Sequence, residues 1–394
     1  MVSKDKIKTC CKRAIENVIY ESCTDVDLFN RPFEIEYLKD SQFQGEMCET
    51  ITDAISQGKI ENLKLHKLGH VLVPKKNLFD FRKCALTEIY DEIVYLTLVL
   101  IIAKNVESAR INKNKHRVYS YRYRCYETGR IFDADYNYTA FRSEASRKAC
   151  LRNNKVMIEC DLSNFYDRLN IHRIDSTLKS LNNVDEDIID LINESLLFWA
   201  NRDSYGLPVG SNASRILAEV ALLEIDNFMI ANKIDFCRFV DDYRIFASDA
   251  QKAHSQLAML VQRLSKEGIT LNSQKTKLTD ISSWKAEKNK SIVDNDSDKT
   301  NIASEACEKN TKHFVDENKS KIIRGYSGLV PTKFRELTLS QIEKLQEKSL
   351  DEMYNVLKET ILVDPKSISE FIKTIVAQNR IDYLAKVPEL LKKF

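Results

Sequence analysis

The stretch Ile234-Asp-Phe-Cys-Arg-Phe-Val-Asp-Asp-Tyr-Arg-Ile-Phe-Ala-Ser248 places two adjacent carboxylates, Asp241 and Asp242, inside an otherwise apolar segment. Short runs of aromatic and β-branched residues on both sides are typical of strands, so we expect a β-hairpin with the two aspartates at its tight turn. Aspartates are ordinary turn residues, and a solvated hairpin tip is one interpretation. The apolar flanks favour another, because two negative charges at the edge of a core require a cation to neutralise them.

The composition is that of a globular protein. The chain has 394 residues, of which 43% are hydrophobic, and a formal net charge of +2. This length predicts a large core and two or three domains. The ten cysteines include no pair at C-x-x-C spacing, which argues against a zinc site. Because no apolar run is long enough to span a bilayer, we expect a soluble, reduced, cytoplasmic protein without a membrane partner.

A basic, aromatic-rich segment lies between Arg110 and Lys155. It contains twelve Lys or Arg residues against four Asp or Glu, interleaved with tyrosines and phenylalanines. Basic side chains attract phosphates and aromatic rings stack on bases, so this mixture suits single-stranded or hybrid nucleic acid. Tyr-rich strands are also ordinary sheet material. The candidate nucleic-acid contacts in this segment are Arg122, Arg124 and Arg130.

A further carboxylate follows the apolar segment Val156–Cys160, which predicts a compact strand. Asp161 comes directly after it and would lie at the rim of a sheet, a common position for a metal ligand. Asp161 or Ser163 could instead cap the helix that follows. Taken alone, this motif favours the capping interpretation.

The loop Gly206-Leu-Pro-Val-Gly210 precedes a predicted helix that Ser211 or Asn212 could cap. Two glycines in five residues let the backbone approach a ligand closely. A plain loop-to-helix transition would require no ligand. The loop is therefore a candidate binding element only if other motifs accompany it.

The segment after the aspartate hairpin predicts a helix that begins at Ser248 or Asp249 and ends at Gly268, followed by a returning strand. Together with the upstream elements, residues 156–278 predict an antiparallel sheet with helices on one face.

Three of these motifs occur in a fixed order. Asp161 followed by Tyr166, the loop 206–210 and Phe239-Val-Asp-Asp242 resemble the palm motifs of reverse transcriptases. The resemblance covers roughly residues 70–280. Phe239 stands where the family usually has tyrosine, and we expect it to contact the primer.

Neighbouring segments extend the resemblance. The hairpin from Val73 to Arg82 is similar to the fingers motif of the family, and residues 268–277 look like its fourth palm motif. Residues 211–219 and the basic, tyrosine-rich segment before Asp161 look most like the prokaryotic antiphage-defence and abortive-infection reverse transcriptases, which are related to retron and group II intron enzymes. The resemblance therefore implies a role in antiphage defence.

The resemblance implies an α+β fold: a right-hand polymerase with fingers, an antiparallel-sheet palm and an α-helical, thumb-like C-terminal domain. The expected divisions are N-terminal helices and fingers (1–155), palm (156–280), a polar linker or insertion (281–325) and the thumb-like domain (326–394).

The resemblance also implies the reaction and its residues. Two Mg²⁺ ions would be held by the catalytic aspartates Asp161, Asp241 and Asp242. The aromatic ring of Tyr166 would collide with a 2′-hydroxyl, so we expect deoxynucleotides as substrates. The nucleotide-binding residues implied are Lys75, Arg82, Tyr166, Gly210 and Lys275.

The expected partners are an RNA template, a DNA product and dNTPs, with a structured non-coding RNA and a second defence protein or a homo-oligomer as further candidates. Three alternatives stay open from the sequence. These are untemplated or protein-primed DNA synthesis, RNA-dependent RNA synthesis, and a catalytically silent nucleic-acid-binding assembly protein. Tyr166 argues against RNA synthesis, and the presence of all three aspartates argues against loss of chemistry.

Overall fold

The computed structural model describes residues 2–21, 32–74, 81–201, 203–284, 343, 345–359 and 365–391. The chain begins with the helices α1 (Lys4–Glu21), α2 (Pro32–Tyr37), α3 (Ser41–Ser56) and α4 (Ile60–Leu63). The hairpin of β1 (Gly69–Pro74) and β2 (Phe81–Leu86) follows, with Val73 opposite Arg82 in its register. This antiparallel pair confirms the predicted hairpin at this position, while its tip lies outside the described residues.

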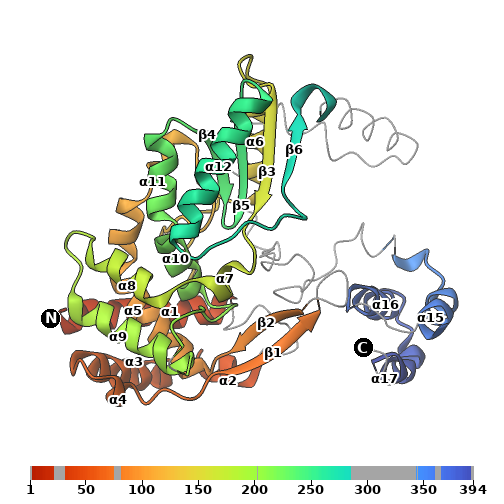
Figure 1. The fold of residues 1–394 in the computed structure, drawn as a ribbon. Helices are drawn as coiled ribbons and strands as arrows, with labels where there is room; N and C mark the ends of the chain where they lie inside the picture. The colour runs from red at the N-terminus through yellow and green to blue at the C-terminus, as the bar shows by residue number, and fades with distance from the viewer. Residues whose placement is uncertain are drawn as a thin grey trace.

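Helix α5 (Ile89–Ala109) is the centre of the helical part of the molecule (Figure 1). Its sequence is apolar on all sides, and such a helix is stable only when it is surrounded by protein. Accordingly, α5 packs against α1, α9 (Glu186–Trp199) and α10 (Asn212–Ala221). In the described part of the chain, no helix is long and apolar enough to cross a membrane.

The second half of the molecule is built on a four-stranded sheet. Its strands are β3 (Val156–Asp161), β4 (Asp235–Phe239), β5 (Asp242–Ala247) and β6 (Lys277–Asp280), in the order β4-β5-β3-β6. Every neighbouring pair is antiparallel. The predicted α+β class with an antiparallel sheet is therefore confirmed, as is the hairpin of β4 and β5.

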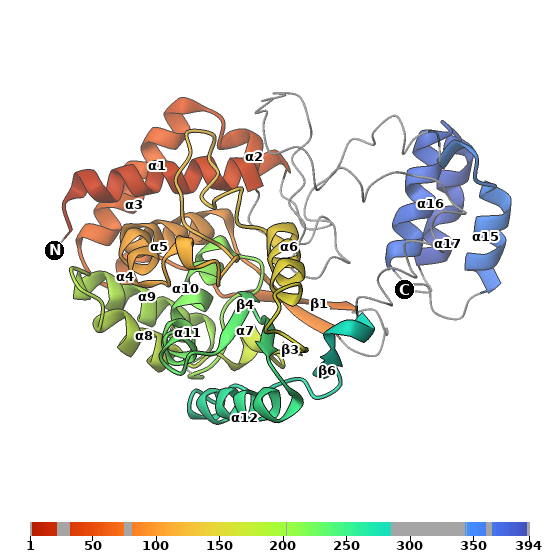
Figure 2. The same ribbon diagram turned by 90° about the horizontal axis from the view of Figure 1, so that it is seen from above.

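Helices cover both faces of this sheet (Figure 2). Ile158 and Ile245 on one face belong to the main core, with α11 (Leu223–Ala231) and α12 (Ala250–Lys266). Met157 and Phe246 on the other face pack in a smaller cluster with α6 (Tyr138–Ala149). The expectation of helices on one face agrees with α11 and α12, which belong to the segment 156–278. The second face is covered by α6, which comes from upstream of that segment.

Several predicted helix boundaries are confirmed. The Ser211 hydroxyl accepts a hydrogen bond from the Ala213 amide at the start of α10, and Asp249 caps α12. Gly268 follows α12 with φ +73°, a left-handed conformation that favours glycine. Of the two interpretations of Asp161, the structure excludes the cap: Asn164, not Asp161 or Ser163, is the N-cap residue of α7 (Phe165–Arg168).

The remaining described elements complete two parts of the chain. Helix α8 (Ile171–Lys179) packs on α9 and α10. The C-terminal region is helical, as predicted, and has an apolar cluster of its own that includes Leu350, Phe371 and Leu390. Its elements are α15 (Leu350–Glu359), α16 (Pro365–Ala377), the 3₁₀ turn Ile381–Lys386 and α17 (Val387–Leu391). The predicted domain boundaries stay predictions, and the polar linker lies largely outside the described residues.

Candidate active site

The three predicted aspartates lie together at one end of the sheet, where β3 leads into α7 (Figure 1). Asp161 is the last residue of β3 and is directly opposite Asp242, the first residue of β5. Asp241 belongs to the two-residue turn between β4 and β5, and its carbonyl accepts a hydrogen bond of 3.1 Å from the Leu162 amide. Directly opposed residues of antiparallel strands have Cβ atoms about 4.5–5.5 Å apart, so the backbone brings these carboxylates within one small site.

Lys275, another predicted site residue, contacts this group. Its Nζ donates a hydrogen bond of 3.0 Å to Asp161 Oδ2. Burial lowers the pKa of Lys275, but the bond to Asp161 and the nearby aspartate charges outweigh it and leave the pKa raised. Lys275 therefore carries its proton beside the predicted aspartates.

Asp242 has a basic neighbour that the sequence did not single out. The Arg244 guanidinium lies 3.6 Å from Asp242 Oδ1 and 3.6 Å from Glu159 Oε2. Burial raises the pKa of Asp242, and the Asp161 charge adds to this effect while Arg244 opposes it. Glu159, Asp242 and Arg244 lie on one face of adjacent strands, so the two-residue spacing of charges along each strand could have revealed them.

Asp161 and Asp242 each contact a protein cation, Lys275 and Arg244 respectively. No three His, Cys, Asp or Glu side chains in the described part of the chain are arranged to hold a metal ion. The chemistry of the donor set nevertheless suits Mg²⁺, which prefers carboxylate oxygens. Asp161 and Asp242 would have to exchange their contacts with Lys275 and Arg244 for contacts with the ions.

Tyr166 lies on α7 and is 6% exposed. Burial raises the pKa of its phenol. Because α7 follows directly on β3, which ends at Asp161, Tyr166 lies near the aspartate site. The Tyr166 carbonyl accepts a hydrogen bond of 3.0 Å from the Leu207 amide. This bond ties the glycine loop to α7.

The glycine loop also contacts the fingers hairpin. The Ala85 amide on β2 donates a hydrogen bond of 3.0 Å to the Val209 carbonyl. Gly206 and Gly210 have φ of +98° and +118°, so both positions favour glycine over any other residue. Arg82 lies on β2 and is half-buried, whereas Lys75 lies outside the described residues.

The basic segment before α6 divides into buried and exposed arginines. Arg122 is 1% exposed and donates to the carbonyls of Val118 and Ile111 and to Glu107. The prediction that Arg122 contacts nucleic acid is corrected by this burial, because its guanidinium is occupied by the protein itself.

Arg124 and Arg130 differ from Arg122. Their guanidinium groups lie 5.0 and 5.9 Å from the ring centroid of Tyr126, and the Arg124 side chain is 56% exposed. Phe239 lies beside the aspartates in an aromatic group, with its ring centroid 5.4 Å from that of Tyr138 and 6.2 Å from that of Tyr121. Arg124 and Arg130 therefore form a basic and aromatic group with Tyr126, and Phe239 belongs to a second aromatic group at the sheet.

A buried ion network below the turn was missed by the sequence reasoning. Arg238 has no exposed surface and pairs with Glu219 and Asp226. Burial opposes the charge of Glu219, but Arg110 and Arg238 outweigh it and lower the pKa of Glu219. The signal was available: an arginine inside the apolar strand Asp235–Phe239 requires buried partners.

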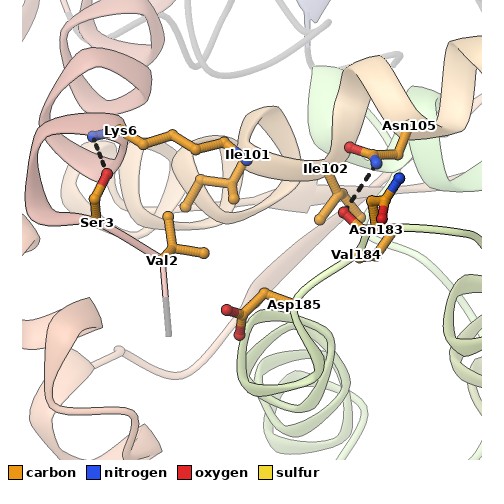
Figure 3. Close-up of a pocket in the computed structure, with 9 residues that line it drawn as sticks. All are labelled: Val2, Ser3, Lys6, Ile101, Ile102, Asn105, Asn183, Val184 and Asp185. Carbon is orange, nitrogen blue, oxygen red and sulfur yellow. Dashed lines mark hydrogen bonds between the residues drawn. The ribbon is translucent and has the colours of Figure 1, made fainter.

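A separate pocket of about 360 Å³ lies between α1, α5 and the loop before α9 (Figure 3). Lys6, Asn105 and Asp185 line it, together with apolar side chains. It shares no residue with the aspartate site.

Comparison with known proteins identifies the family. A model described as reverse transcriptase (RNA-dependent DNA polymerase) matches residues 102–313. No curated protein matches the chain.

Among solved structures, the chain is similar to telomerase from Candida albicans in complex with a TWJ fragment of telomeric RNA, with 12% identity and a TM-score of 0.41. That match covers 87% of this chain and 58% of the telomerase chain. For apo telomerase from Candida tropicalis, truncated from its C-terminal domain, identity is 14%, the TM-score 0.38, and the coverage 62% of each chain. The chain thus spans less than two thirds of either telomerase. The family match covers more than half of the chain and includes all three aspartates, and the chain belongs to the reverse transcriptase (RNA-dependent DNA polymerase) family.

Proposed function

We propose that this protein is an RNA-directed DNA polymerase, a nucleotidyltransferase that extends a primer with deoxynucleotides along an RNA template. The observation that carries the proposal is the position of Asp161 opposite Asp242, with Asp241 in the adjoining turn. These aspartates lie within the segment that matches the family. In this reaction the primer 3′-hydroxyl oxygen bonds to the α-phosphorus of the dNTP, and pyrophosphate leaves.

The family generally uses divalent metal ions, and we propose Mg²⁺ held by Asp161, Asp241 and Asp242, where it would activate the hydroxyl and neutralise charge on the phosphates. Lys275 keeps its proton beside Asp161 and is the candidate for protonating pyrophosphate. Arg82, together with Lys75, is the candidate for binding the triphosphate.

Tyr166 and Gly210 complete the proposed nucleotide site. The hydrogen bond from the Leu207 amide to the Tyr166 carbonyl ties the Tyr166 backbone to the glycine loop, and burial of the side chain restricts its ring. A ring held in this way can exclude a 2′-hydroxyl by collision, which favours dNTPs over NTPs. Comparing incorporation of the two substrate classes separates this proposal from RNA-dependent RNA synthesis.

Template and primer would lie over the exposed side chain of Arg124 and the half-buried side chains of Tyr126 and Arg130, with Phe239 against the primer. Arginine beside a partly exposed aromatic ring offers both phosphate attraction and base stacking. The C-terminal helices are the proposed thumb.

The biological role proposed is antiphage defence with a dedicated non-coding RNA, in the cytoplasm, and with a second defence protein or a further copy of this chain. It rests on the resemblance of residues 211–219 and of the basic, tyrosine-rich segment before Asp161. Phage plaque counts on cells with wild type or Asp241→Asn test it, and equal counts would contradict it.

The biochemical test is primer extension on an RNA template with Mg²⁺ and dNTPs. Wild type should extend the primer, and Asp241→Asn should not. Asp203→Asn removes an exposed carboxylate from the loop before Gly206 and is the matched control, with wild-type extension expected. Phenol extraction of labelled product before and after protease treatment detects protein-primed synthesis, and extension without a template would indicate an untemplated reaction.

A further inference from the structure

The turn that carries Asp241 is attached to a buried arginine. Arg238 lies three residues before Asp241 on β4, and its side chain has no exposed surface. Its Nη2 lies 2.8 Å from Glu219 Oε2, and its Nε donates a hydrogen bond of 2.9 Å to Asp226 Oδ1. Glu219 belongs to α10 and Asp226 to α11, so two helices fix the direction of the guanidinium.

The same guanidinium reaches the turn. Arg238 Nη1 donates a hydrogen bond of 3.0 Å to the carbonyl of Val240. Val240 has φ +55°, a conformation in which a β-branched residue is a steric outlier. Such a conformation persists only where its surroundings hold it in place. The hydrogen bond from Arg238 therefore restrains the backbone of Val240, the residue directly before Asp241.

Backbone contacts brace Arg238 on its other side. Its amide donates to the Arg117 carbonyl at 2.7 Å, and its carbonyl accepts from the Tyr119 amide at 2.9 Å. Glu219 also accepts hydrogen bonds from Arg110 and from the Ser120 hydroxyl. The guanidinium is therefore part of a rigid frame, and Val240 is the point where that frame contacts the catalytic turn.

We infer that Arg238 is a positioning residue, which holds Val240 in its left-handed conformation and so directs Asp241 toward the site of Asp161 and Asp242. The inference rests on the proposed function, in which these aspartates bind the metal ions. Stability alone does not account for the arrangement, because buried ion pairs contribute little net stability compared with apolar side chains. The hydrogen bond from Arg238 to the carbonyl of Val240 instead indicates that the guanidinium holds the turn in place.

The test compares Arg238→Lys with the full-length wild-type protein. Lysine keeps the charge but lacks the planar fork that reaches two carboxylates and a carbonyl together. Arg122→Met is the control, because Arg122 is also buried, at 1% exposure, and bonds to no residue of the turn. The readouts are the thermal midpoint, the Mn²⁺ dissociation constant from the EPR signal of the free ion with a dideoxy-terminated template–primer, and the Mg²⁺ dependence of primer extension.

Arg238→Lys should weaken Mn²⁺ binding and raise the Mg²⁺ concentration for half-maximal extension by about tenfold, equivalent to about 1.4 kcal/mol. Arg122→Met should lower the thermal midpoint without either change. Adding Val240→Gly to Arg238→Lys should recover metal binding but not the thermal midpoint, since glycine adopts positive φ without a steric penalty.

The inference is overturned if Arg238→Lys leaves the metal dependence unchanged, or if Arg122→Met shifts it by the same amount. It is also overturned if adding Val240→Gly to Arg238→Lys does not restore metal binding. If Arg238→Lys does not fold, Asp226→Asn removes one of the carboxylates that direct Arg238, and the same outcomes decide. Wild type that cannot extend a primer contradicts the proposed function. If wild type extends the primer and the Arg238 variants bind metal and depend on Mg²⁺ as wild type does, only the positioning role is contradicted.

Discussion

Asp161 and Asp242 are directly opposed residues of the antiparallel strands β3 and β5, at the end of the sheet where β4 turns into β5. The two positions are 81 residues apart in the sequence and neighbours in the fold. Two negative charges held side by side repel each other, and in this structure Lys275 and Arg244 offset that repulsion. Both aspartates of this pair therefore contact protein cations at the end of the sheet.

Replacing Tyr166 should relax the choice of sugar. Tyr166→Ala removes the buried ring beside the aspartates, so the preference for dNTPs over NTPs should fall by roughly tenfold or more, the range for one missing steric contact. Tyr166→Phe keeps the ring and should keep the preference. The measurement is kcat/KM for each substrate class in single-nucleotide extension; an unchanged ratio in Tyr166→Ala would refute the gate.

Arg124 and Arg130 should contribute to nucleic-acid affinity through charge. Replacing either with alanine should weaken binding of an RNA–DNA hybrid and reduce the dependence of log K on log salt by about one unit for each lost phosphate contact. Lys59→Ala, a charge loss at the exposed start of α4, should leave both quantities unchanged. A salt titration by fluorescence anisotropy measures this, and identical slopes for all variants would exclude these contacts.

Gly129 should tolerate no side chain. A Cβ at this position would lie 2.4 Å from the Glu16 carbonyl oxygen, and its φ is +78°. Gly129→Ala should therefore lower the free energy of unfolding by more than about 2 kcal/mol, through both overlap and backbone strain.

Gly58→Ala is the control for Gly129, because Gly58 has φ +65° and no atom within 4 Å of the added Cβ. The Gly58→Ala substitution introduces backbone strain without steric overlap, so it should lower the free energy of unfolding by about 1 kcal/mol. Equal losses in urea unfolding would show that α1 does not pack on the loop at Gly129 as described.

The ion pairs of Asp235 should stabilise the fold in a pH-dependent way. Lys148 Nζ lies 2.6 Å from Asp235 Oδ1, and Arg117 pairs with the same oxygen. Burial raises the pKa of Asp235, but these two cations outweigh it and lower the pKa below its ordinary value of 3.8. A lowered folded pKa means that the stabilisation is complete above 3.8 and is lost as the pH falls through the lowered value.

Asp235→Asn should thus reduce the free energy of unfolding at pH 7 by about 1–3 kcal/mol, and the difference from wild type should shrink at acidic pH. Glu194→Gln, which removes an exposed charge from α9, should change neither quantity. Urea unfolding between pH 3 and pH 7 measures both. If the difference in free energy of unfolding between wild type and Asp235→Asn grew toward low pH, the lowered pKa of Asp235 would be contradicted.

The sequence predicts the strands that carry the three aspartates well, because their signals are local. The apolar runs around Asp161 and around Asp241 and Asp242 are short and alternate, and the structure places strands there. The position of α6 on the second face could not be predicted from the palm segment, since the cluster of Met157 with Phe141 joins residues from different parts of the chain.

Arg122 and Arg238 show that the number of charges in a segment does not predict which arginines are buried. Arg122 belongs to a basic, tyrosine-rich segment, whose composition predicts a nucleic-acid contact, but carbonyls and Glu107 bind it inside the protein. Arg238 lies among apolar residues and therefore requires buried partners. Those partners, Glu219 and Asp226, lie on helices 19 and 12 residues away in sequence, so only the fold could identify them.

Single-nucleotide extension of a primer on an RNA template by Asp242→Asn tests the central claim most directly. If Asp161 and Asp242 form one catalytic site, this variant and Asp161→Asn should each lose on the order of 10³-fold or more in rate, and the double variant should lose little beyond either one, because groups that act as a unit are not additive. Asp203→Asn should extend at the wild-type rate. Wild-type extension by Asp242→Asn, or fully additive losses in the double variant, would contradict the claim.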